Sequence, residues 1–211
     1  MKKIVHLSHN DLDGYGAQLV AKKTGRVVAQ YNTNYGAEIL EKVEIAIAAM
    51  NGAYVNHMLL ITDVNLTLEI ADAIDAKQKE FGFELLLLDH HITGKDVAIK
   101  YDWYNLDASK CATRIAYEYF QNEITDENID MFSQIVNAYD LWQENHELFH
   151  KGKLLNEQVF EGYKFPKEVH SLKVDYVLHM LEKVNEQLKN YSVAQTEDCL
   201  NKFKRMFLSN R

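Results

Sequence analysis

The sequence is poor in cysteine and proline. Of its 211 residues two are cysteines, Cys111 and Cys199, and one, Pro166, is a proline. The cysteines lie far apart and form no CxxC pair, so the sequence predicts neither a thiolate zinc site nor a disulfide framework. It also lacks internal repeats, low-complexity tracts and Gly/Ser-rich linkers. Nothing in it therefore points to a repeat protein or a small disulfide scaffold.

Long hydrophobic runs are missing as well. No apolar segment reaches the roughly 20 residues of a membrane span, and the first three residues lead directly into a strand-like run rather than a signal peptide. We therefore expect a cytoplasmic protein with no membrane partner. A hydrophobic content of 47% is ordinary for a soluble globular protein. The length suits one large domain, or a domain with a small appendage, and allows a substantial core.

Basic residues are fewer than acidic residues. The chain has 23 Lys and Arg against 31 Asp and Glu, which gives a formal net charge of −8. A protein that holds a long polyanion usually has a basic face, so extended duplex DNA is a poor partner. Bound divalent cations would reverse the charge of an acidic site locally. Phosphorylated small molecules and short single-stranded nucleic acids thus remain compatible with this composition.

The first part of the chain alternates strand and helix patterns. Apolar runs predict strands at 3–8, 26–30, 57–62, 83–88 and 99–103, and helical periodicity occurs at 14–23, 36–50 and 66–80. This β-α-β-α order predicts an α/β fold with a mainly parallel sheet flanked by helices.

From about residue 109 the pattern is helical. Helices are expected at 110–121 and 126–139, and an amphipathic stripe from Leu172 to Tyr191 predicts one long helix whose furthest end would be Phe207. Core packing explains such a stripe, and a homodimer contact is the alternative. We expect a first domain over residues 1–142 and a helical C-terminal extension over 143–211 packed on it.

Acidic and imidazole side chains follow three of the expected strands. They are His9, Asp11 and Asp13 after the first, Asp63 at the end of LLIT, and Asp89, His90 and His91 at the end of LLLL. Parallel strands bring their carboxyl ends to one edge of the sheet, so these groups should converge there. Asp140, in NAYD, adds another carboxylate at the end of a helical run. Carboxylates this close would repel one another unless cations neutralised them, so the convergence predicts a metal site.

Each of these residues has a simpler explanation when it is taken alone. HxDxD followed by glycine also describes a solvated turn that caps a helix. A single His9 could be a hydrogen-bonded strand-end histidine, Asp63 a helix cap, and Asp140 part of an ordinary helix end. The four segments together favour the metal site.

The four segments also resemble the signature motifs of a known group. HNDLDGYGA, ITDVN, LDHH and NAYD, in this order, resemble the motifs of the DHH phosphoesterase superfamily. That superfamily includes RecJ-like exonucleases, oligoribonuclease/pAp-phosphatase enzymes, cyclic-dinucleotide phosphodiesterases and manganese-dependent inorganic pyrophosphatases. The resemblance covers about the first two-thirds of the chain. Most relatives have a second domain with a Gly-rich GGGH-like segment, and nothing after Asp140 resembles it.

The resemblance implies a site with two divalent cations, usually Mn²⁺, with Mg²⁺ as the alternative. One cation would bind His9, Asp11 and Asp63, and the other Asp13, Asp63, His90 and Asp140, so that Asp63 bridges them. His91 would face the substrate phosphate as a catalytic residue together with Asp63. Asp89 would orient a neighbouring ligand rather than bind metal.

The residue types agree with such a site. Oxygen-rich ligands with a minority of imidazole suit Mn²⁺ or Mg²⁺. Two cations can activate a water molecule and stabilise the oxygens of an in-line displacement at phosphorus. The predicted reaction is hydrolysis of a phosphoester or phosphoanhydride without a covalent intermediate. At the start of the next helix Ser109, Lys110 and Arg114 are candidate phosphate-binding residues, with helix capping and solvation as the alternative.

Two functions remain open on the sequence alone. The preferred one is a manganese-dependent phosphohydrolase of short oligonucleotides or nucleotide phosphates, with pyrophosphatase activity as a variant. The other is a non-catalytic metal- or nucleotide-binding regulatory module. Trp103 and Trp142 could stack on a base or lie in the core.

Overall fold

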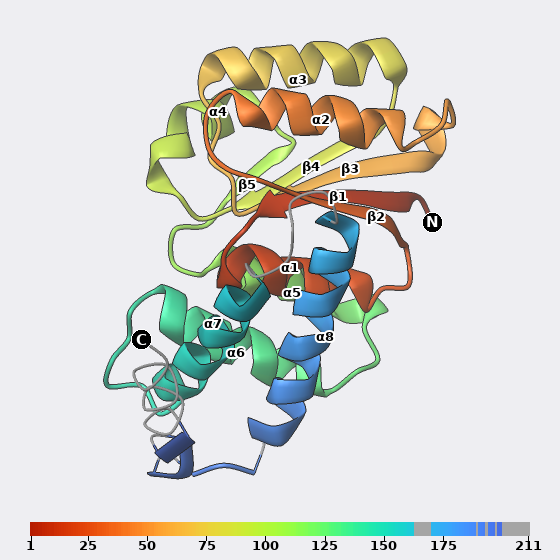
Figure 1. The fold of residues 1–211 in the computed structure, drawn as a ribbon. Helices are drawn as coiled ribbons and strands as arrows, with labels where there is room; N and C mark the ends of the chain where they lie inside the picture. Colours follow the sequence, from red (N-terminus) through yellow and green to blue (C-terminus); the bar gives the residue numbers. More distant parts are fainter. Residues whose placement is uncertain (163–169, 189, 193, 197, 200–211) are drawn as a thin grey trace, which may run out of the picture.

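One five-stranded parallel sheet organises the chain (Figure 1). The computed structural model describes residues 1–162, 170–188, 190–192, 194–196 and 198–199. The strands are β1 (Lys3–His9), β2 (Val27–Thr33), β3 (His57–Thr62), β4 (Glu84–Asp89) and β5 (Tyr104–Leu106), in the order β2-β1-β3-β4-β5. Every neighbouring pair is parallel. The predicted α/β class, with a parallel sheet followed by a helical part, is confirmed.

Helices cover both faces of the sheet. They are α1 (Leu12–Lys22), α2 (Glu38–Ala48), α3 (Leu68–Phe81), α4 (Lys95–Lys100), α5 (Ala112–Phe120), α6 (Asn128–Asp140), α7 (Phe149–Gly162) and α8 (His170–Leu188). Short 3₁₀ turns occur at Tyr54–Asn56, Ile92–Gly94 and Gln121–Glu123. In Figure 1, α2, α3 and α4 lie on one face, and α1 and α5 lie on the other with α6, α7 and α8 beyond them.

The side chains of the central strands alternate between these two layers. In β3, Met58 and Leu60 belong to the core shared with α1 and α5, whereas Leu59 and Ile61 belong to the core shared with α2 and α3. Successive side chains of a strand point to opposite faces, so a strand covered on both sides must be apolar throughout. This requirement accounts for the continuous apolar run HMLLIT in the middle of the sheet.

The strand order has a consequence for ligand binding. The chain passes from β1 to β2 on one side of β1, and then crosses to β3 on the other side. The direction of the connections therefore reverses at β1. In open α/β sheets, ligands bind beyond the carboxyl ends of the strands at such a reversal. The residues that follow β1 and β3 lie at this position.

One predicted strand is wrong. The run 99–103 is not a strand: Lys95–Lys100 form α4, and β5 begins at Tyr104, which pairs with Leu87. Ile99 is 75% exposed on α4. Ile99, Tyr101 and Trp103 alternate with polar residues, so local periodicity imitates a strand. Tertiary contacts decide otherwise, because the Trp103 indole donates a hydrogen bond to Asp75 on α3.

The C-terminal helices share a core with the first helix. Leu155 on α7 and Val177 and Leu181 on α8 are buried in the cluster that contains Leu12 and Tyr15 of α1. The proposed boundary at residue 142 stays a prediction, and the predicted helix end at Phe207 lies outside the described residues. Within the described ranges, no helix combines the length and the apolar character needed to cross a bilayer.

Candidate metal centre

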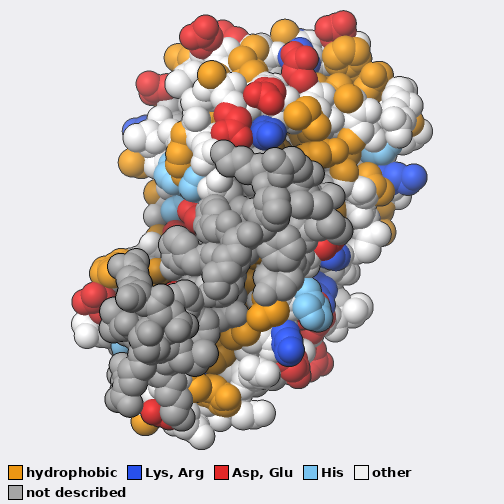
Figure 2. Space-filling model, in the orientation of Figure 1, with side chains coloured by type: hydrophobic (Ala, Val, Ile, Leu, Met, Phe, Trp, Pro, Cys, Tyr) orange, Lys and Arg blue, Asp and Glu red, His pale blue; other side chains and the backbone are white. Residues whose placement is uncertain are grey.

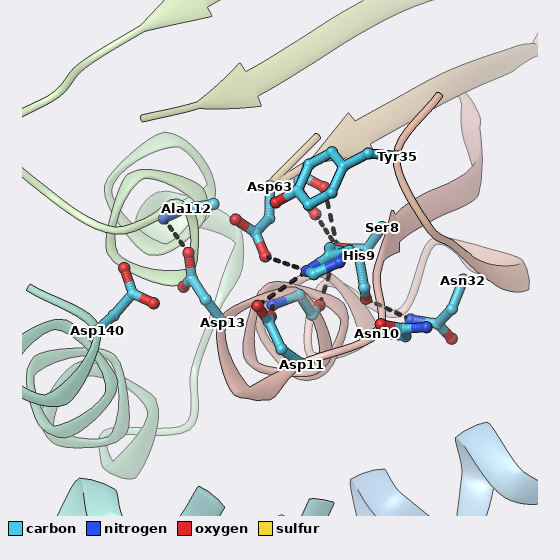
Figure 3. A network of polar contacts seen from close by, with 12 residues as sticks. Ser8, His9, Asn10, Asp11, Asp13, Asn32, Tyr35, Asp63, Ala112 and Asp140 are labelled. Carbon is cyan, nitrogen blue, oxygen red and sulfur yellow. Dashed lines mark hydrogen bonds and ion pairs between the residues drawn. The ribbon is translucent and has the colours of Figure 1, made fainter. Parts of the chain in front are cut away.

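The turn between β1 and α1 presents the first two candidate ligands. Asp11 is the N-cap of α1 and accepts a hydrogen bond from the backbone N–H of Gly14 at 3.0 Å. Its other oxygen lies 2.8 Å from His9 Nδ1. The turn is tight, since a Cβ at position 14 would lie 2.2 Å from the His9 carbonyl oxygen. The glycine of this motif is therefore a steric requirement of the turn that places His9 and Asp11 together (Figure 3).

Asp13 connects this turn to the start of α5. Its carboxylate is buried and accepts hydrogen bonds from the backbone N–H groups of Ala112, at 2.7 Å, and Thr113, at 2.8 Å. The Thr113 hydroxyl also donates to the Asp13 carbonyl. A carboxylate at a helix N-terminus satisfies free N–H groups and interacts favourably with the helix dipole. These contacts hold the Asp13 side chain in one orientation.

Asp63 lies at the centre of the group. It follows β3 with φ of 57°, in the left-handed region that non-glycine residues seldom adopt, and its residue surface is 2% exposed. Oδ1 lies 3.3 Å from His90 Nε2. Oδ2 has no hydrogen-bond partner among the described residues, and His9 Nδ1 is 3.8 Å away. A buried carboxylate oxygen without a donor is costly, and a cation would satisfy it.

His90 and Asp140 complete the second half of the group. His90 Nε2 lies 3.7 Å from both Asp13 Oδ2 and Asp140 Oδ2. Asp140 is the last residue of α6 and points toward Asp13 in Figure 3. We call His9, Asp11, Asp13, Asp63, His90 and Asp140 the carboxylate–imidazole cluster. Histidine and acidic atoms also meet at the left edge of the face drawn in Figure 2, between the upper and lower parts of the molecule.

The cluster divides into ligand sets suited to separate cations. His9, Asp11 and Asp63 form one set, and Asp13, His90 and Asp140 form another; in each, the possible ligand atoms lie within 4.8 Å of one another. A third set consists of Asp63, Asp89, His90 and His91. The structure thus brings the six residues predicted as metal ligands close together, although Asp63 is grouped with His9 and Asp11 and not with Asp13 and Asp140. That they bind metal stays a prediction. The donor types and the unsatisfied Asp63 oxygen both fit divalent cations.

The electrostatics of the cluster are those of crowded carboxylates. Burial, together with the charges of Asp11 and Asp13, raises the pKa of Asp63 well above its usual value. Burial and the same two charges raise the pKa of Asp140 to about 8. Burial also raises the pKa of Asp11, but hydrogen bonds from His9 and Gly14 outweigh it and leave that pKa at about 2. Crowding therefore favours the protonated forms of Asp63 and Asp140 when no cation neutralises them.

Asp89 and His91 form a separate pair beside the cluster. The Asp89 carboxylate is fully buried and accepts hydrogen bonds from His91 Nδ1 at 2.7 Å and from the Tyr104 hydroxyl. The hydrogen bond to Asp89 raises the pKa of His91 although partial burial opposes it. The hydrogen bond to Asp89 restricts the orientation of the His91 ring, and the predicted orienting role of Asp89 toward a metal ligand stays a prediction.

The three candidate phosphate-binding residues have acidic partners within the protein. Ser109 donates to the Asp107 side chain, and the Lys110 ammonium lies 2.7 Å from Glu118. The Arg114 guanidinium contacts Asp130 and Glu118. All three side chains are thus engaged within the protein by Asp107, Glu118 and Asp130. Their role in binding substrate stays a prediction.

Sequence reasoning missed two tyrosines at this edge of the sheet. Tyr104, on β5, bonds to Asp89, and Tyr35, after β2, contacts His9 and His91. Tyr35 could have been found. The second strand was expected to end at residue 30, but it continues to Thr33, so Tyr35 also follows the carboxyl end of a parallel strand. The short β5 gave no comparable signal.

The chain is similar in sequence or structure to several known proteins. The chain is 33% identical over 217 aligned positions to a 3′,5′-cyclic-nucleotide phosphodiesterase of Helicobacter pylori, and 28% identical over 166 positions to oligoribonuclease NrnB of Bacillus subtilis. A crystal structure of an uncharacterized Helicobacter pylori protein superposes with a TM-score of 0.84 at 31% identity, covering 95% of this chain and 62% of that one. No family model matches the chain.

The chain is shorter than these relatives. The alignments cover 94% and 72% of this chain but only 61% of the phosphodiesterase and 40% of the oligoribonuclease. The matched region therefore includes most of this chain, and each relative has further sequence outside it.

Proposed function

Because the chain belongs to the DHH phosphoesterase superfamily, we propose that it is a metal-dependent phosphodiesterase that hydrolyses phosphodiester bonds of nucleotides. The observation that supports this most directly is Asp63, whose buried Oδ2 has no hydrogen-bond partner among the described residues and which belongs to two of the potential ligand sets. A carboxylate in that position can bridge two cations. Two-cation sites of this kind catalyse in-line displacement at phosphorus.

We assign the cations to the two ligand sets of the cluster. His9, Asp11 and Asp63 would hold one, and Asp13, His90 and Asp140 would hold the other with Asp63 shared. When bound, the cations would stabilise charge on the phosphoryl oxygens and lower the pKa of the attacking water. Carboxylate and imidazole ligands favour Mn²⁺, with Mg²⁺ as the second candidate.

His91 is the proposed phosphate-facing residue. Its Nδ1 is engaged by Asp89, so Nε2 is the ring atom that can contact a ligand. Asp89 raises the pKa of His91, which increases the fraction of protonated imidazole near neutral pH. A protonated ring would donate to a phosphoryl oxygen and stabilise the charge that develops there. The water oxygen bonds to phosphorus, the ester P–O bond breaks, and the water proton passes to the leaving oxygen.

The substrates we propose are nucleotide phosphodiesters, either 3′,5′-cyclic nucleotides or short oligoribonucleotides. The two curated relatives have these activities in their names. The net charge of −8 favours short substrates over long polyanions, because a small ligand needs only the local field of the bound cations.

The test is turnover by the purified chain with Mn²⁺ or Mg²⁺ on 3′,5′-cyclic AMP, a diribonucleotide, pAp and pyrophosphate. Asp63→Asn should abolish hydrolysis and weaken metal binding measured by calorimetry. Asp72→Asn, on the exposed surface of α3, is the matched control and should behave as wild type.

The remaining outcomes separate the alternatives. Hydrolysis of pyrophosphate alone would indicate a pyrophosphatase instead. Metal binding without turnover of any of the four compounds would indicate the non-catalytic module and would contradict the proposed function.

A further inference from the structure

Tyr35 is placed against two residues of the proposed site. It lies in the loop after β2, and its ring centroid is 4.5 Å from that of His9, with the ring planes tilted by 33°. Its edge contacts His91 at 5.8 Å between centroids, and its hydroxyl oxygen is 3.2 Å from His91 Nε2. The residue is nevertheless 44% exposed. Figure 3 shows the ring beside His9 and Asp63. Tyr35 is therefore part of the wall of the site and is accessible to a ligand.

The position of the hydroxyl follows from contacts on both sides. Packing against His9 fixes the ring, so the hydroxyl remains near His91 without depending on one hydrogen bond. His91 is fixed in turn by Asp89, which engages Nδ1 and leaves Nε2 directed toward Tyr35. Two hydrogen-bonding atoms, Tyr35 Oη and His91 Nε2, thus lie side by side at an accessible surface.

Such a pair matches the chemistry of a phosphodiester. A phosphoryl group presents oxygens that accept hydrogen bonds only, and charge-assisted hydrogen bonds to them are among the stronger ones in proteins. A ligand oxygen that reaches His91 Nε2 would also come close to the Tyr35 hydroxyl, because only 3.2 Å separates the two atoms. The phenol hydroxyl can donate its proton to that ligand oxygen.

We propose that Tyr35 is a substrate-contacting residue whose hydroxyl donates a hydrogen bond to a phosphoryl oxygen beside His91. The inference rests on the proposed phosphodiesterase function. It adds the loop after β2 to the four segments of that site, which contain His9 to Asp13, Asp63, Asp89 to His91 and Asp140. The competing explanation is that Tyr35 only packs against His9 and positions His91. Tyr35→Phe separates these explanations, because it keeps the ring and removes the hydroxyl.

The experiment measures kcat and KM with Mn²⁺ on the substrate that wild type hydrolyses, and the binding of inorganic phosphate to the metal-loaded protein by calorimetry. Tyr35→Phe should lower kcat/KM by roughly ten- to hundredfold, the effect of losing one hydrogen bond to a charged group. It should also weaken phosphate binding, with metal affinity unchanged. The matched control is Tyr119→Phe on α5, a tyrosine 47% exposed, which should match wild type.

A double substitution tests whether the hydroxyl acts directly. In a His91→Ala background, Tyr35→Phe should still lower kcat/KM if the phenol touches substrate. Absence of a further loss there, or wild-type kinetics and phosphate affinity in Tyr35→Phe alone, would overturn the proposal. Failure of wild type to hydrolyse any substrate would count against the proposed function, and the phosphate titration would still decide the role of Tyr35.

Discussion

At the scale of single residues, the Asp89 carboxylate accepts hydrogen bonds from two neighbouring side chains. It is fully buried, accepts from both His91 and Tyr104, and occupies the first position of the Asp89-His90-His91 motif. A buried carboxylate that receives a hydrogen bond from an imidazole fixes the orientation of that ring and favours its protonated form. The chemistry expected of His91 therefore depends on Asp89.

Asp89→Asn tests that dependence. An amide has one acceptor oxygen where the carboxylate has two, so its NH₂ group would face either His91 or Tyr104. We expect kcat to fall by about tenfold or more, with little change in metal stoichiometry. Steady-state kinetics and calorimetry provide the measurements, and Asp72→Asn is the control. Unchanged kcat would contradict the orienting role.

Burial of His6 predicts a pH dependence of protein stability that is independent of catalysis. His6 lies within β1, its Nε2 is 2.9 Å from the Thr62 hydroxyl, and Nδ1 has no hydrogen-bond partner among the described residues. Burial lowers the pKa of His6 from 6.5 to about 3. Between these pH values the unfolded chain binds a proton at this position and the folded protein does not. Stability contributed here is complete above pH 6.5 and is lost as the pH falls toward 3.

The measurement is the free energy of unfolding in denaturant across that pH range. One proton corresponds to a slope of about 1.4 kcal/mol per pH unit. His6→Gln should reduce the slope by up to that amount, whereas His179→Gln, at an exposed position of α8, should not. Equal slopes in wild type and His6→Gln would show that His6 does not remain neutral in the folded protein.

At the scale of elements, the site depends on how closely α1 approaches its neighbours. A Cβ at Gly14 would meet the His9 backbone at 2.2 Å, and a Cβ at Gly16 would meet the Thr113 hydroxyl oxygen at 2.4 Å. The first contact is with main chain and cannot be relieved by a rotamer change. The second is with the Thr113 side chain of α5, and a substitution that shortens this side chain can relieve it.

Adding Thr113→Ala should therefore change the stability of the Gly14→Ala and Gly16→Ala variants differently. We expect each single glycine substitution to lower the free energy of unfolding by about 1–3 kcal/mol, as overpacking does. Adding Thr113→Ala should offset part of the loss in Gly16→Ala and none of it in Gly14→Ala. Denaturant unfolding of the five variants provides the double-mutant cycles. Equal rescue of both glycine variants would contradict the backbone clash at Gly14.

At the scale of the whole molecule, negative charge is concentrated at one edge of the sheet. Four carboxylates meet there: Asp11 from the turn after β1, Asp13 from α1, Asp63 directly after β3 and Asp140 from the end of α6. Their mutual repulsion opposes the folded state, and ligand binding to the native state reverses this by mass action. The site and the stability of the protein are therefore linked through divalent cations.

Thermal unfolding should report this link. Mn²⁺ at 100 times its dissociation constant stabilises a native protein by about 2.7 kcal/mol, which corresponds to several degrees in Tm for a chain of this size. EDTA should reverse the shift. Asp63→Asn should lose most of the metal-induced shift and have a higher Tm than wild type without metal, because one repelling charge is gone. A metal-induced shift of wild-type size in Asp63→Asn would contradict the bridging role.

The sequence by itself determined the fold class and the membership of the cluster. Apolar strand-like runs separated by helical periodicity require a covered parallel sheet, and a parallel sheet gathers its strand ends at one edge. His9, Asp63 and His90 could be expected together for that reason alone. Their grouping and cation assignment came from the family resemblance, and metal binding itself stays a prediction.

Only the tertiary structure decided which side chains complete the site and where the last strand begins. Tyr35 and Tyr104 reach Asp89 and His91 through the spatial order β2-β1-β3-β4-β5, which no local pattern encodes. The run at 99–103 has strand-like alternation, but the strand forms at Tyr104–Leu106. Trp103 lies outside it and hydrogen-bonds to Asp75 on α3. Periodicity records which residues are buried, whereas pairing depends on contacts between segments distant in the chain.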